Sequence, residues 1–501
     1  MSPKSCFFKV IFVPFSFCTM AISSMALVHV PVKVAVIGAG ISGLEVAYEL
    51  KKNGFCVDVY EAQYRVGGRI LSVEINGSIT ELGGHDLCDG GSAEHILDLI
   101  DELGLIIERL SLRRFMTQYF DGFAFIDIRE RMKQLICAPD ELWKKLIEYK
   151  KKAYSMQDVL YHVFPQDPLL REIFAIKLAD YEGAPACRLS PFVIESLYKR
   201  LLTGMKMSNN DDQSETFEYM YVKGGNALIT ERLAERLNGS VHLGMALKNI
   251  KRDAQNVYHL TFQNGKECTA DIVVFTIPCP TYKNIAIDSS VITPEHLAQI
   301  TSVQYGTNAK IMLPAYGNHM NGVFTNGRMV CYLNEQTGII TAYYVNEHGV
   351  FTEDTINNHF QEDLRLLRSL YRLPHELPQA FVADISAQFL AYNGPVGHSW
   401  LNDLYAQGSY SCIGAGQEEW LTAMKLDQGE WVRVLFAPMH DNTIWFAGEH
   451  TTILLDYCGT MEAAVESGMR VARMIKQRWK LSLSATKELV DVAERERYTE
   501  S

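Results

Sequence analysis

The 501-residue sequence predicts an α/β protein with more than one domain. Three observations lead to this prediction. Near the N-terminus, a β-branched run is followed by a glycine-rich turn and an amphipathic stretch. Near the C-terminus, a second strand-like run ends in glycine and again leads into a helical pattern. Between these two regions, helical stretches and short strand-like runs indicate an inserted second domain.

The composition limits the classes of function. Apolar residues make up 48% of the chain and charged residues 21%, which is enough for a large core. The net charge of −12 argues against a nucleic-acid partner, because such a partner needs a basic face. The eleven cysteines form no CxxC pair and no cluster with zinc-ligand spacing. We therefore expect mostly buried free thiols and no metal site.

The N-terminal thirty residues differ from the rest. Apolar runs at 7–13 and 15–27 follow a weakly basic start, and small residues lie at 23–26. We expect residues 1–26 to be a signal peptide, which predicts a periplasmic or secreted protein. An uncleaved anchor, or a wrongly chosen start codon and a cytoplasmic protein, are the alternatives. The polar residues from Leu481 onward predict no C-terminal membrane anchor.

The first motif joins a buried strand to a helix. Residues 32–37 are the β-branched run VKVAVI, and the next six residues are GAGISG. Gly38 permits a tight turn, Gly40 lets the backbone approach a pyrophosphate, and Gly43 lets helix and strand pack closely. The free N–H groups at the start of the helix can then face negative phosphates.

A second strand completes the pattern of a dinucleotide site. It covers residues 56–60 and closes on Glu61, whose carboxylate can accept hydrogen bonds from ribose hydroxyls. Both NAD and FAD fit this much of the pattern, and the residues that follow distinguish them.

Residues 65–69 read RVGGR. Gly67 and Gly68 allow a second close approach of the backbone, and Arg69 offers a cation to a phosphate. The run resembles the xRxGGR signature of the two-dinucleotide-binding flavoproteins, in particular the flavin-containing amine oxidase family. The resemblance implies FAD, with Glu61 on the adenosine ribose and Arg69 on the pyrophosphate side.

The C-terminal motif supplies the other half of the site. Residues 443–450 read as a strand that ends in Gly448 and Glu449, and a helix opens near residue 460 and runs to about Trp479. In the family, the N-terminus of this helix faces the flavin and stabilises the negative charge of the reduced ring. The resemblance therefore implies that the two ends of the chain bind FAD together.

The middle of the chain is less distinctive. Residues 92–205 have a mostly helical pattern, in which Ser92 is a candidate N-cap, and residues 208–216 read as an exposed loop. The run 221–226 (YVKGGN) leads into an amphipathic helix, and the resemblance implies that the backbone of Leu247 holds adenine. Strand-like runs lie at 241–243, 247–250, 257–262 and 271–277.

Together with these segments, the resemblance, which extends over nearly the whole chain from Val32 to Trp479, implies the full fold. It is an α/β protein with a Rossmann-like FAD-binding domain built from discontinuous segments and an inserted α+β substrate domain with a mostly helical part. The FAD-binding domain takes residues 32–88, 221–280 and 430–480, the substrate domain takes 89–220 (mostly helical) and 281–429, and 481–501 form a polar tail.

Lys310 lies in a strand-like stretch among apolar residues. On the residues alone it is an ordinary strand lysine with its ammonium in solvent. Many members of the amine oxidase family place a lysine here that contacts flavin N5 through a water molecule. The resemblance therefore implies a catalytic role.

Residues 400–411 are rich in aromatic side chains and resemble the family segment WxxDxxxxGxY. In monoamine oxidases a cysteine before the tyrosine bonds covalently to the flavin, and here Ser409 has that place. The resemblance thus implies non-covalent FAD, with Tyr410 as one wall of an aromatic substrate cage. Thr460 stands where monoamine oxidases have the second cage tyrosine, and Tyr457 is a candidate to refill that space.

The substrate amine is left open. Venom-type L-amino-acid oxidases carry a carboxylate-binding arginine after the Glu-Leu-Gly segment, whereas this chain continues as His85-Asp86. Arg113 or Arg114 remain candidates for that cation. Asp86 and Asp89 are candidates to face a cationic amine, as acids do in polyamine oxidases, or are loop acids in solvent.

The resemblance implies an FAD-dependent amine oxidase. Hydride passes from the amine α-carbon to flavin N5, water hydrolyses the imine, and O₂ reoxidises the flavin to give hydrogen peroxide. The alternatives are an L-amino-acid oxidase, a desaturase or protoporphyrinogen-oxidase-like dehydrogenase, and a non-enzymatic FAD-binding protein. A homodimer is compatible with the sequence. The predicted site residues are Lys310, Tyr410, Trp400 and Thr460 for catalysis; Gly38, Gly40, Ser42, Gly43, Glu61, Gly67, Gly68, Arg69, Gly84, His85, Leu247, Ser409, Gly448, Glu449, Thr460 and Met461 for FAD; and Asp86, Asp89 and Tyr457 for substrate.

Overall fold

The structure, a computed structural model, describes residues 8–10, 29–87, 93–113, 116–128, 139–194, 216–316, 322–371, 373–386 and 391–479. Residues 1–26, where a signal peptide is expected (apart from β1, Phe8–Val10), Asp89, residues 208–215 and the tail 481–501 lie outside this part of the chain. Among the described residues, no helix combines the length and apolar character needed to cross a membrane. The same residues contain no group of metal-ligating side chains that could hold an ion.

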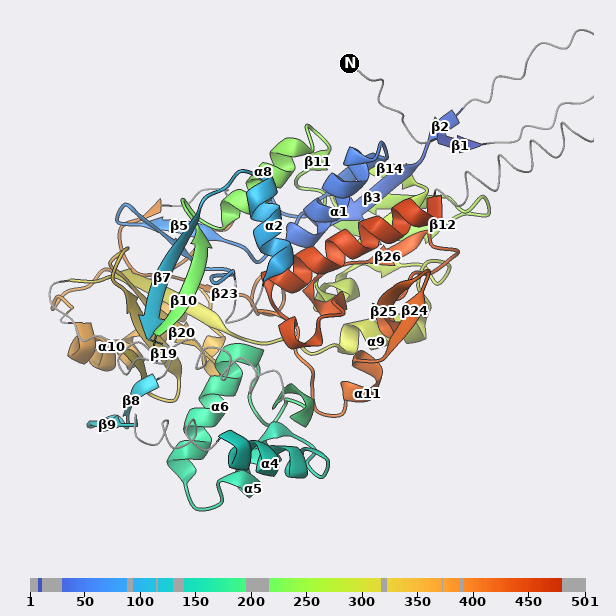
Figure 1. Cartoon of the computed structure of the whole chain (residues 1–501). Helices are drawn as coiled ribbons and strands as arrows, with labels where there is room; N and C mark the ends of the chain where they lie inside the picture. The colour runs from blue at the N-terminus through green and yellow to red at the C-terminus, as the bar shows by residue number, and fades with distance from the viewer. Residues whose placement is uncertain are drawn as a thin grey trace, which may run out of the picture.

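A parallel sheet of five strands lies at the centre of one half of the molecule. The strand order is β11–β4–β3–β15–β26, and each neighbouring pair is parallel. Three widely separated parts of the chain thus build one sheet (Figure 1), and the predicted α/β architecture is confirmed. The strands are β11 (Val241–His242), β4 (Cys56–Tyr60), β3 (Lys33–Ile37), β15 (Ile272–Phe275) and β26 (Ile444–Phe446).

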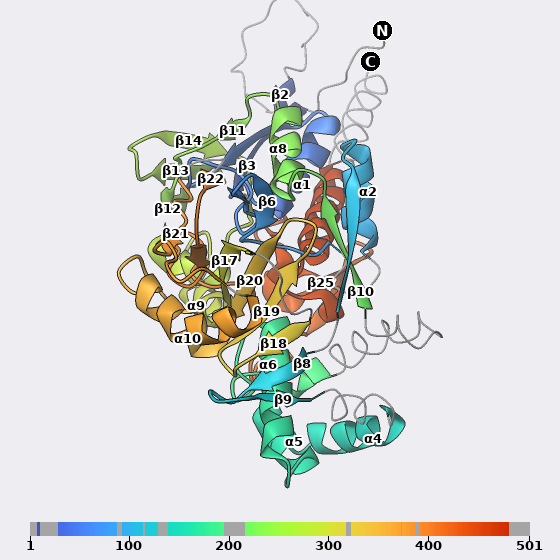
Figure 2. The same cartoon turned by 90° about the vertical axis from the view of Figure 1, so that its left-hand side faces the viewer.

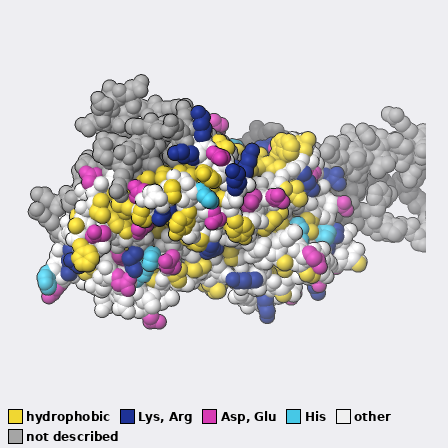
Figure 3. Space-filling view, turned by 90° about the horizontal axis from the view of Figure 1, so that it is seen from below, with side chains coloured by type: hydrophobic (Ala, Val, Ile, Leu, Met, Phe, Trp, Pro, Cys, Tyr) yellow, Lys and Arg dark blue, Asp and Glu magenta, His cyan; other side chains and the backbone are white. Residues whose placement is uncertain are grey.

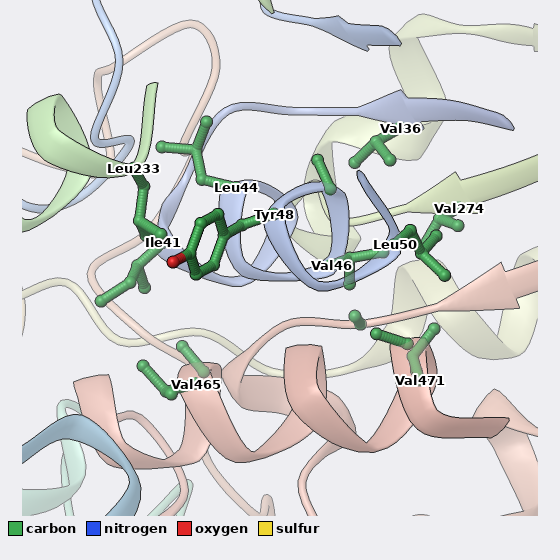
Figure 4. Packing of buried hydrophobic residues seen from close by; sticks show 14 of the residues in the cluster. Val36, Ile41, Leu44, Val46, Tyr48, Leu50, Leu233, Val274, Val465 and Val471 are labelled. Carbon is green, nitrogen blue, oxygen red and sulfur yellow. The ribbon is translucent and has the colours of Figure 1, made fainter. Parts of the chain in front are cut away.

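Helix α1 (Ile41–Lys52) begins directly after β3 and is buried along most of its length, because it lies between the sheet and other helices. The helix over residues 461–479 packs against it, and Figure 4 shows Val465 and Val471 facing α1. A Cβ atom on Gly43 would lie 2.2 Å from the carbonyl oxygen of Gly38, so only glycine permits this approach of helix to strand. Helices α8 (Ala227–Arg236) and α2 (Glu94–Glu102) complete this layer.

A second, eight-stranded sheet builds the other half of the molecule. Its central strand β17 (Ala309–Pro314) is buried at all six positions, and helix α10 (Ile356–Tyr371) contributes to the core beside it. Figure 2 shows this sheet between the α1 layer and helices α4 and α5. The other strands, in sheet order around β17, are β21 (Phe381–Val382), β23 (Val396–Ser399), β20 (Ile339–Tyr344), β19 (Met329–Asn334), β18 (Val323–Thr325), β8 (Met116–Phe120) and β9 (Phe125–Asp127).

The segment predicted to be mostly helical contains helices and strands. Helices α4 (Pro139–Lys150), α5 (Met156–Val163) and α6 (Pro168–Glu182) fit the prediction. Strand β7 (Ile107–Arg113) does not, and neither do β8 and β9. Strand β7 pairs with β10 (Thr216–Val222) over a seven-residue register, so the helical prediction was wrong there, and Thr216 belongs to a strand rather than to the loop. Residues 110–113 (LSLR) alternate between apolar and polar side chains, a strand period that the sequence interpretation overlooked.

Charged side chains of both signs are interspersed over the face seen from below, as Figure 3 shows.

Smaller elements complete the described part of the chain. The smaller sheets are β14 (Glu267–Ala270), β13 (Tyr258–Phe262), β12 (Leu247–Arg252) and β16 (Ala286–Ile287); β22 (Ala391–Tyr392), β5 (Ser72–Ile75) and β6 (Ser78–Glu81); β24 (Met424–Asp427) and β25 (Glu430–Arg433); and β1 with β2 (His29–Pro31), and the short helices include α9 (Pro294–Ser302) and α11 (Glu418–Leu421).

Candidate active site

A cavity of about 1030 Å³ lies where the two halves of the structure meet. One side is formed by the carboxyl ends of the parallel strands, because Ile37, Tyr60 and Thr276 line it. The other side carries residues of the second sheet, among them Lys310 and Tyr343. Ligands of open parallel sheets bind outside the carboxyl ends of the strands. The volume is at the upper end of the range for small-molecule sites.

The two glycine motifs meet at this cavity. The N–H of Gly67 donates to the carbonyl oxygen of Ala39 at 2.9 Å, and Gly40 and Gly67 form an isolated parallel bridge. A Cβ atom on Gly68 would lie 3.4 Å from the Cα atom of Gly40. The start of α1, including Ser42, lines the cavity next to this bridge. Bare backbone and the N–H groups of a helix N-terminus therefore face the same space, which suits a pyrophosphate.

Glu61 is fixed at the end of β4. Its carboxylate accepts the N–H of Ala39 at 2.6 Å and the N–H of Gln63 at 2.9 Å. Burial raises the pKa of Glu61, and these two hydrogen bonds and the Arg65 guanidinium offset part of that effect. The side chain is thus held at the cavity wall, at the end of the site that is formed by the first glycine motif.

At the other end of the cavity, Arg69 and Glu449 form an ion pair. Arg69 Nη1 lies 2.9 Å from Glu449 Oε1 and also donates to the Ser409 carbonyl at 3.1 Å. The Glu449 carboxylate further accepts the Ser411 hydroxyl at 2.6 Å and the N–H of Gly459 at 3.0 Å. Burial alone would raise the pKa of Glu449, but Arg69 above all, with His450 and the Ser411 hydroxyl, outweighs it, and the pKa falls below its ordinary value. The ionised Glu449 carboxylate therefore links the segments that contain Arg69, Ser411 and Gly459.

Lys310 points from β17 into the cavity wall. Its Nζ donates to the carbonyl oxygens of Glu81 and Gly83, each at 2.7 Å. Burial lowers the pKa of Lys310 to about 8, although the neighbouring Glu81 carboxylate acts in the opposite direction. Burial likewise raises the pKa of Glu81 to about 7. For His85, burial followed by the positive charge of Lys310 lowers the pKa to about 3, so the imidazole is neutral at neutral pH.

Asn226 holds the backbone that receives Lys310, and sequence analysis gave it no role. The residue is fully buried. Its Nδ2 donates to the carbonyls of Gly84 and His85 at 3.1 and 2.8 Å, and its backbone N–H donates to Glu81 Oε1 at 2.8 Å. Its position in the run YVKGGN would have indicated a capping residue, but only the fold brings it to the Glu81–His85 segment.

Tyr410 is fixed from both sides and at its tip. A Cβ atom on Gly183 or on Gly459 would lie 2.8 or 2.7 Å from its ring, so these glycines make room for the tyrosine. The hydroxyl donates to the Asp180 carbonyl at 2.9 Å, and Asn308 Nδ2 donates to the hydroxyl at 3.0 Å. Asn308 Nδ2 also lies 3.0 Å from the hydroxyl of Tyr343, a second cavity tyrosine that sequence analysis did not single out.

Most predicted site residues reach this one cavity. Gly43 and Tyr457 are not among its lining residues, since Gly43 packs on Gly38 instead. Asp89 and Arg114 lie outside the described residues. Asp86 lines the cavity, and its Oδ1 accepts the N–H of Met220 at 3.1 Å. The predicted residues that line the cavity are Gly38, Gly40, Ser42, Glu61, Gly67, Gly68, Arg69, Gly84, His85, Asp86, Leu247, Lys310, Trp400, Ser409, Tyr410, Gly448, Glu449, Thr460 and Met461.

The fold and the site define a dinucleotide-binding α/β protein. The chain belongs to the family of flavin-containing amine oxidoreductases, whose model matches residues 41–476. It is 22% identical to an L-amino-acid oxidase of Demansia vestigiata, over 92% of this chain and 90% of that protein. Among solved structures it resembles putrescine oxidase bound to putrescine (TM-score 0.63, 18% identity, 89% of this chain and 99% of that one). It also resembles the cyclohexylamine oxidase of Brevibacterium oxydans (TM-score 0.65, 16% identity, 90% and 100%).

Family membership makes the chain an oxidoreductase that acts on amines with a flavin cofactor. The residues present fit such a group. The glycine motifs provide a cradle that side chains would fill, and two helix N-termini line the cavity, that of α1 and that of the helix over 461–479. The buried hydroxyl of Ser409 has no hydrogen-bond partner among the described residues, which leaves it available to a ligand.

Proposed function

We propose that this protein is an FAD-dependent amine oxidase that holds FAD non-covalently and produces hydrogen peroxide. The observation that carries the proposal is the position of Lys310. Its ammonium is held by the carbonyls of Glu81 and Gly83 in the wall of the same cavity that both glycine motifs line. When bound, the flavin accepts a hydride from the carbon next to the amine and passes the electrons to O₂.

The chain's own residues bind and orient. Gly40, Gly67 and the N-terminus of α1 would hold the pyrophosphate, and Glu61 would accept hydrogen bonds from the ribose. Leu247 lines the cavity on the adenine side of the proposed arrangement. The Arg69–Glu449 pair closes the site from the C-terminal part of the chain.

Around the reacting amine, Tyr410 and Tyr343 present aromatic rings that Asn308 holds in place. Trp400 lines the cavity as well. Such rings exclude water and leave the reacting carbon between apolar surfaces, and the neutral His85 adds no charge beside them. Lys310 places an ammonium in this wall, and its lowered pKa of about 8 places its titration near physiological pH.

The purified holoprotein tests the proposal. Anaerobic mixing with a panel of monoamines, diamines and L-amino acids should bleach the flavin absorbance for at least one amine, and admission of air should restore it with formation of peroxide. Bound, chemically reducible flavin that no member of the panel reduces would show that the proposal is wrong. Acid precipitation should release the flavin into the supernatant.

A further inference from the structure

The last turns of α6 place a lysine ammonium inside the cavity. Lys177, Asp180 and Tyr181 all line it. Lys177 is 8% exposed, and its Nζ donates to Asp180 Oδ2 at 2.7 Å. The same Nζ lies 4.5 Å from the centroid of the Tyr181 ring. A carboxylate and an aromatic face are groups that bind an ammonium ion well. Asp180 and Tyr181 therefore form an ammonium site, and the side chain of Lys177 occupies it.

This ammonium site adjoins the proposed reaction region. The carbonyl of Asp180 accepts the hydroxyl of Tyr410 at 2.9 Å. Asp180 therefore has two contacts. Its backbone carbonyl holds Tyr410, the proposed wall of the substrate cage, and its side chain pairs with Lys177. A substrate amine that reacts beside Tyr410 would extend its tail past this residue or close to it.

We propose that Lys177 is a specificity-determining residue that makes the enzyme prefer monoamines with an uncharged tail to diamines. The inference rests on the proposed amine oxidation. In a diamine the second ammonium needs a carboxylate, and Lys177 already neutralises Asp180. A second ammonium would also meet the positive charge of Lys177 in a region of low dielectric, where like charges repel strongly.

Most of the other side chains in the substrate region agree with an uncharged tail. The Lys310 ammonium and the Glu81 carboxylate attract each other electrostatically, so these two groups add no net charge when both are ionised. Glu335, another acid of the cavity lining, is exposed to solvent, where its attraction for a cation is screened. The remaining lining on this side comprises Asp86, whose Oδ1 accepts the N–H of Met220, together with Arg109, Gln336 and the apolar or aromatic residues Val323, Val330, Leu333, Tyr332 and Tyr343.

The test compares amines of equal length. We expect wild-type kcat/KM for butylamine and heptylamine to exceed that for putrescine and 1,7-diaminoheptane by about tenfold or more. Lys177→Met should move this ratio toward the diamines by about tenfold, because Asp180 becomes available to the second ammonium. Lys177→Gln, which can still hydrogen-bond to Asp180, should move the ratio in the same direction and serves if the methionine variant folds poorly. Lys177→Met combined with Asp180→Asn removes both charges and should restore the wild-type ratio.

Lys52→Met is the matched control. Lys52 also forms an i,i+3 pair, with Glu49 at 2.7 Å, but it is not part of the cavity lining. It should leave the ratio unchanged. A wild-type preference for diamines, served by Asp86 or Glu335, would overturn the inference, as would an unchanged ratio in both Lys177 variants. If no amine is oxidised at all, the proposed function fails, and calorimetric binding of butylamine and putrescine to wild type and Lys177→Met still decides the role of Lys177.

Discussion

The guanidinium of Arg69 lies 2.9 Å from the carboxylate of Glu449, although 380 positions separate the two residues. This ion pair joins the N-terminal glycine motif to the segment that follows the C-terminal strand β26. Breaking a buried pair by removing one charge costs about 3–5 kcal/mol, because the other charge is left without its partner. The pair should therefore decide how firmly the flavin is held.

We expect Glu449→Gln to lose flavin on gel filtration, seen as a lower ratio of flavin to protein absorbance, and to melt at a lower temperature. The control is Glu430→Gln, which removes a carboxylate from the more exposed pair with Arg473. Glu430→Gln should keep its flavin. Full flavin content in Glu449→Gln would mean that the pair is not needed to hold the cofactor.

Ser409 gives a second prediction about the cofactor. Its hydroxyl is buried in the cavity wall, next to Tyr410. The wild-type flavin should leave the protein on acid precipitation, because a serine cannot form a thioether. We expect Ser409→Cys to retain part of its flavin in the pellet. Ser411→Cys, two residues further along the chain, should release all of it, and retention by wild type would contradict non-covalent binding.

The glycine motifs, the strands beside them and the GGR and Gly-Glu segments could be predicted from the sequence, because each is a local pattern with a backbone requirement. Gly43 is an example: its lack of a side chain is required by the approach of α1 to Gly38. The topology brings these patterns to one cavity. Patterns of this kind can be recognised in the sequence without any knowledge of distant contacts.

The substrate side could not be predicted in the same way. Lys177 and Asp180 are ordinary helix residues in the sequence, and only the packing of α6 against the second sheet places them in the cavity. Tyr343 likewise lies in an unremarkable strand, opposite Lys310 in the β17–β20 register. Tyr457, a candidate substrate residue in the sequence, is absent from the lining of the cavity that the structure describes. Side-chain environments made by long-range contacts leave no local signal.

Lys310 leads to a pH prediction. Its ammonium, with a pKa of about 8, loses its proton as the pH rises through that value. A cation in this wall favours electron transfer to O₂, which builds up negative charge. The rate of reoxidation by O₂ should therefore fall between about pH 7 and 9.5. Lys310→Met should reoxidise slowly at every pH, with a smaller effect on reduction by amine, as stopped-flow mixing would measure. Equal slowing of both half-reactions would mean that Lys310 has another role.

Glu45 provides a test of stability that does not depend on the cofactor chemistry. Glu45 belongs to α1 and is only 2% exposed, and its Oε2 has no hydrogen-bond partner among the described residues. Burial, aided by the charges of Glu49 and Glu102, raises its pKa to about 8, although Lys52 and Lys476 oppose the shift. The carboxyl is therefore neutral in the folded protein across a pH range in which it is ionised in the unfolded chain.

The sign of the effect follows from proton binding. Between about pH 4.5 and 8 the folded state binds a proton that the unfolded state has released, so the contribution of Glu45 to stability falls as the pH rises through this window. Glu45→Gln cannot ionise in either state. We expect its melting temperature to match wild type near pH 5 and to exceed it by several degrees near pH 8.5, measured by calorimetry. Glu49→Gln, at a partly exposed and paired position, should show no such rise, because burial does not hold that carboxylate in its neutral form. A difference between Glu45→Gln and wild type that stays constant from pH 5 to 8.5 would mean that Glu45 is ionised inside the folded protein.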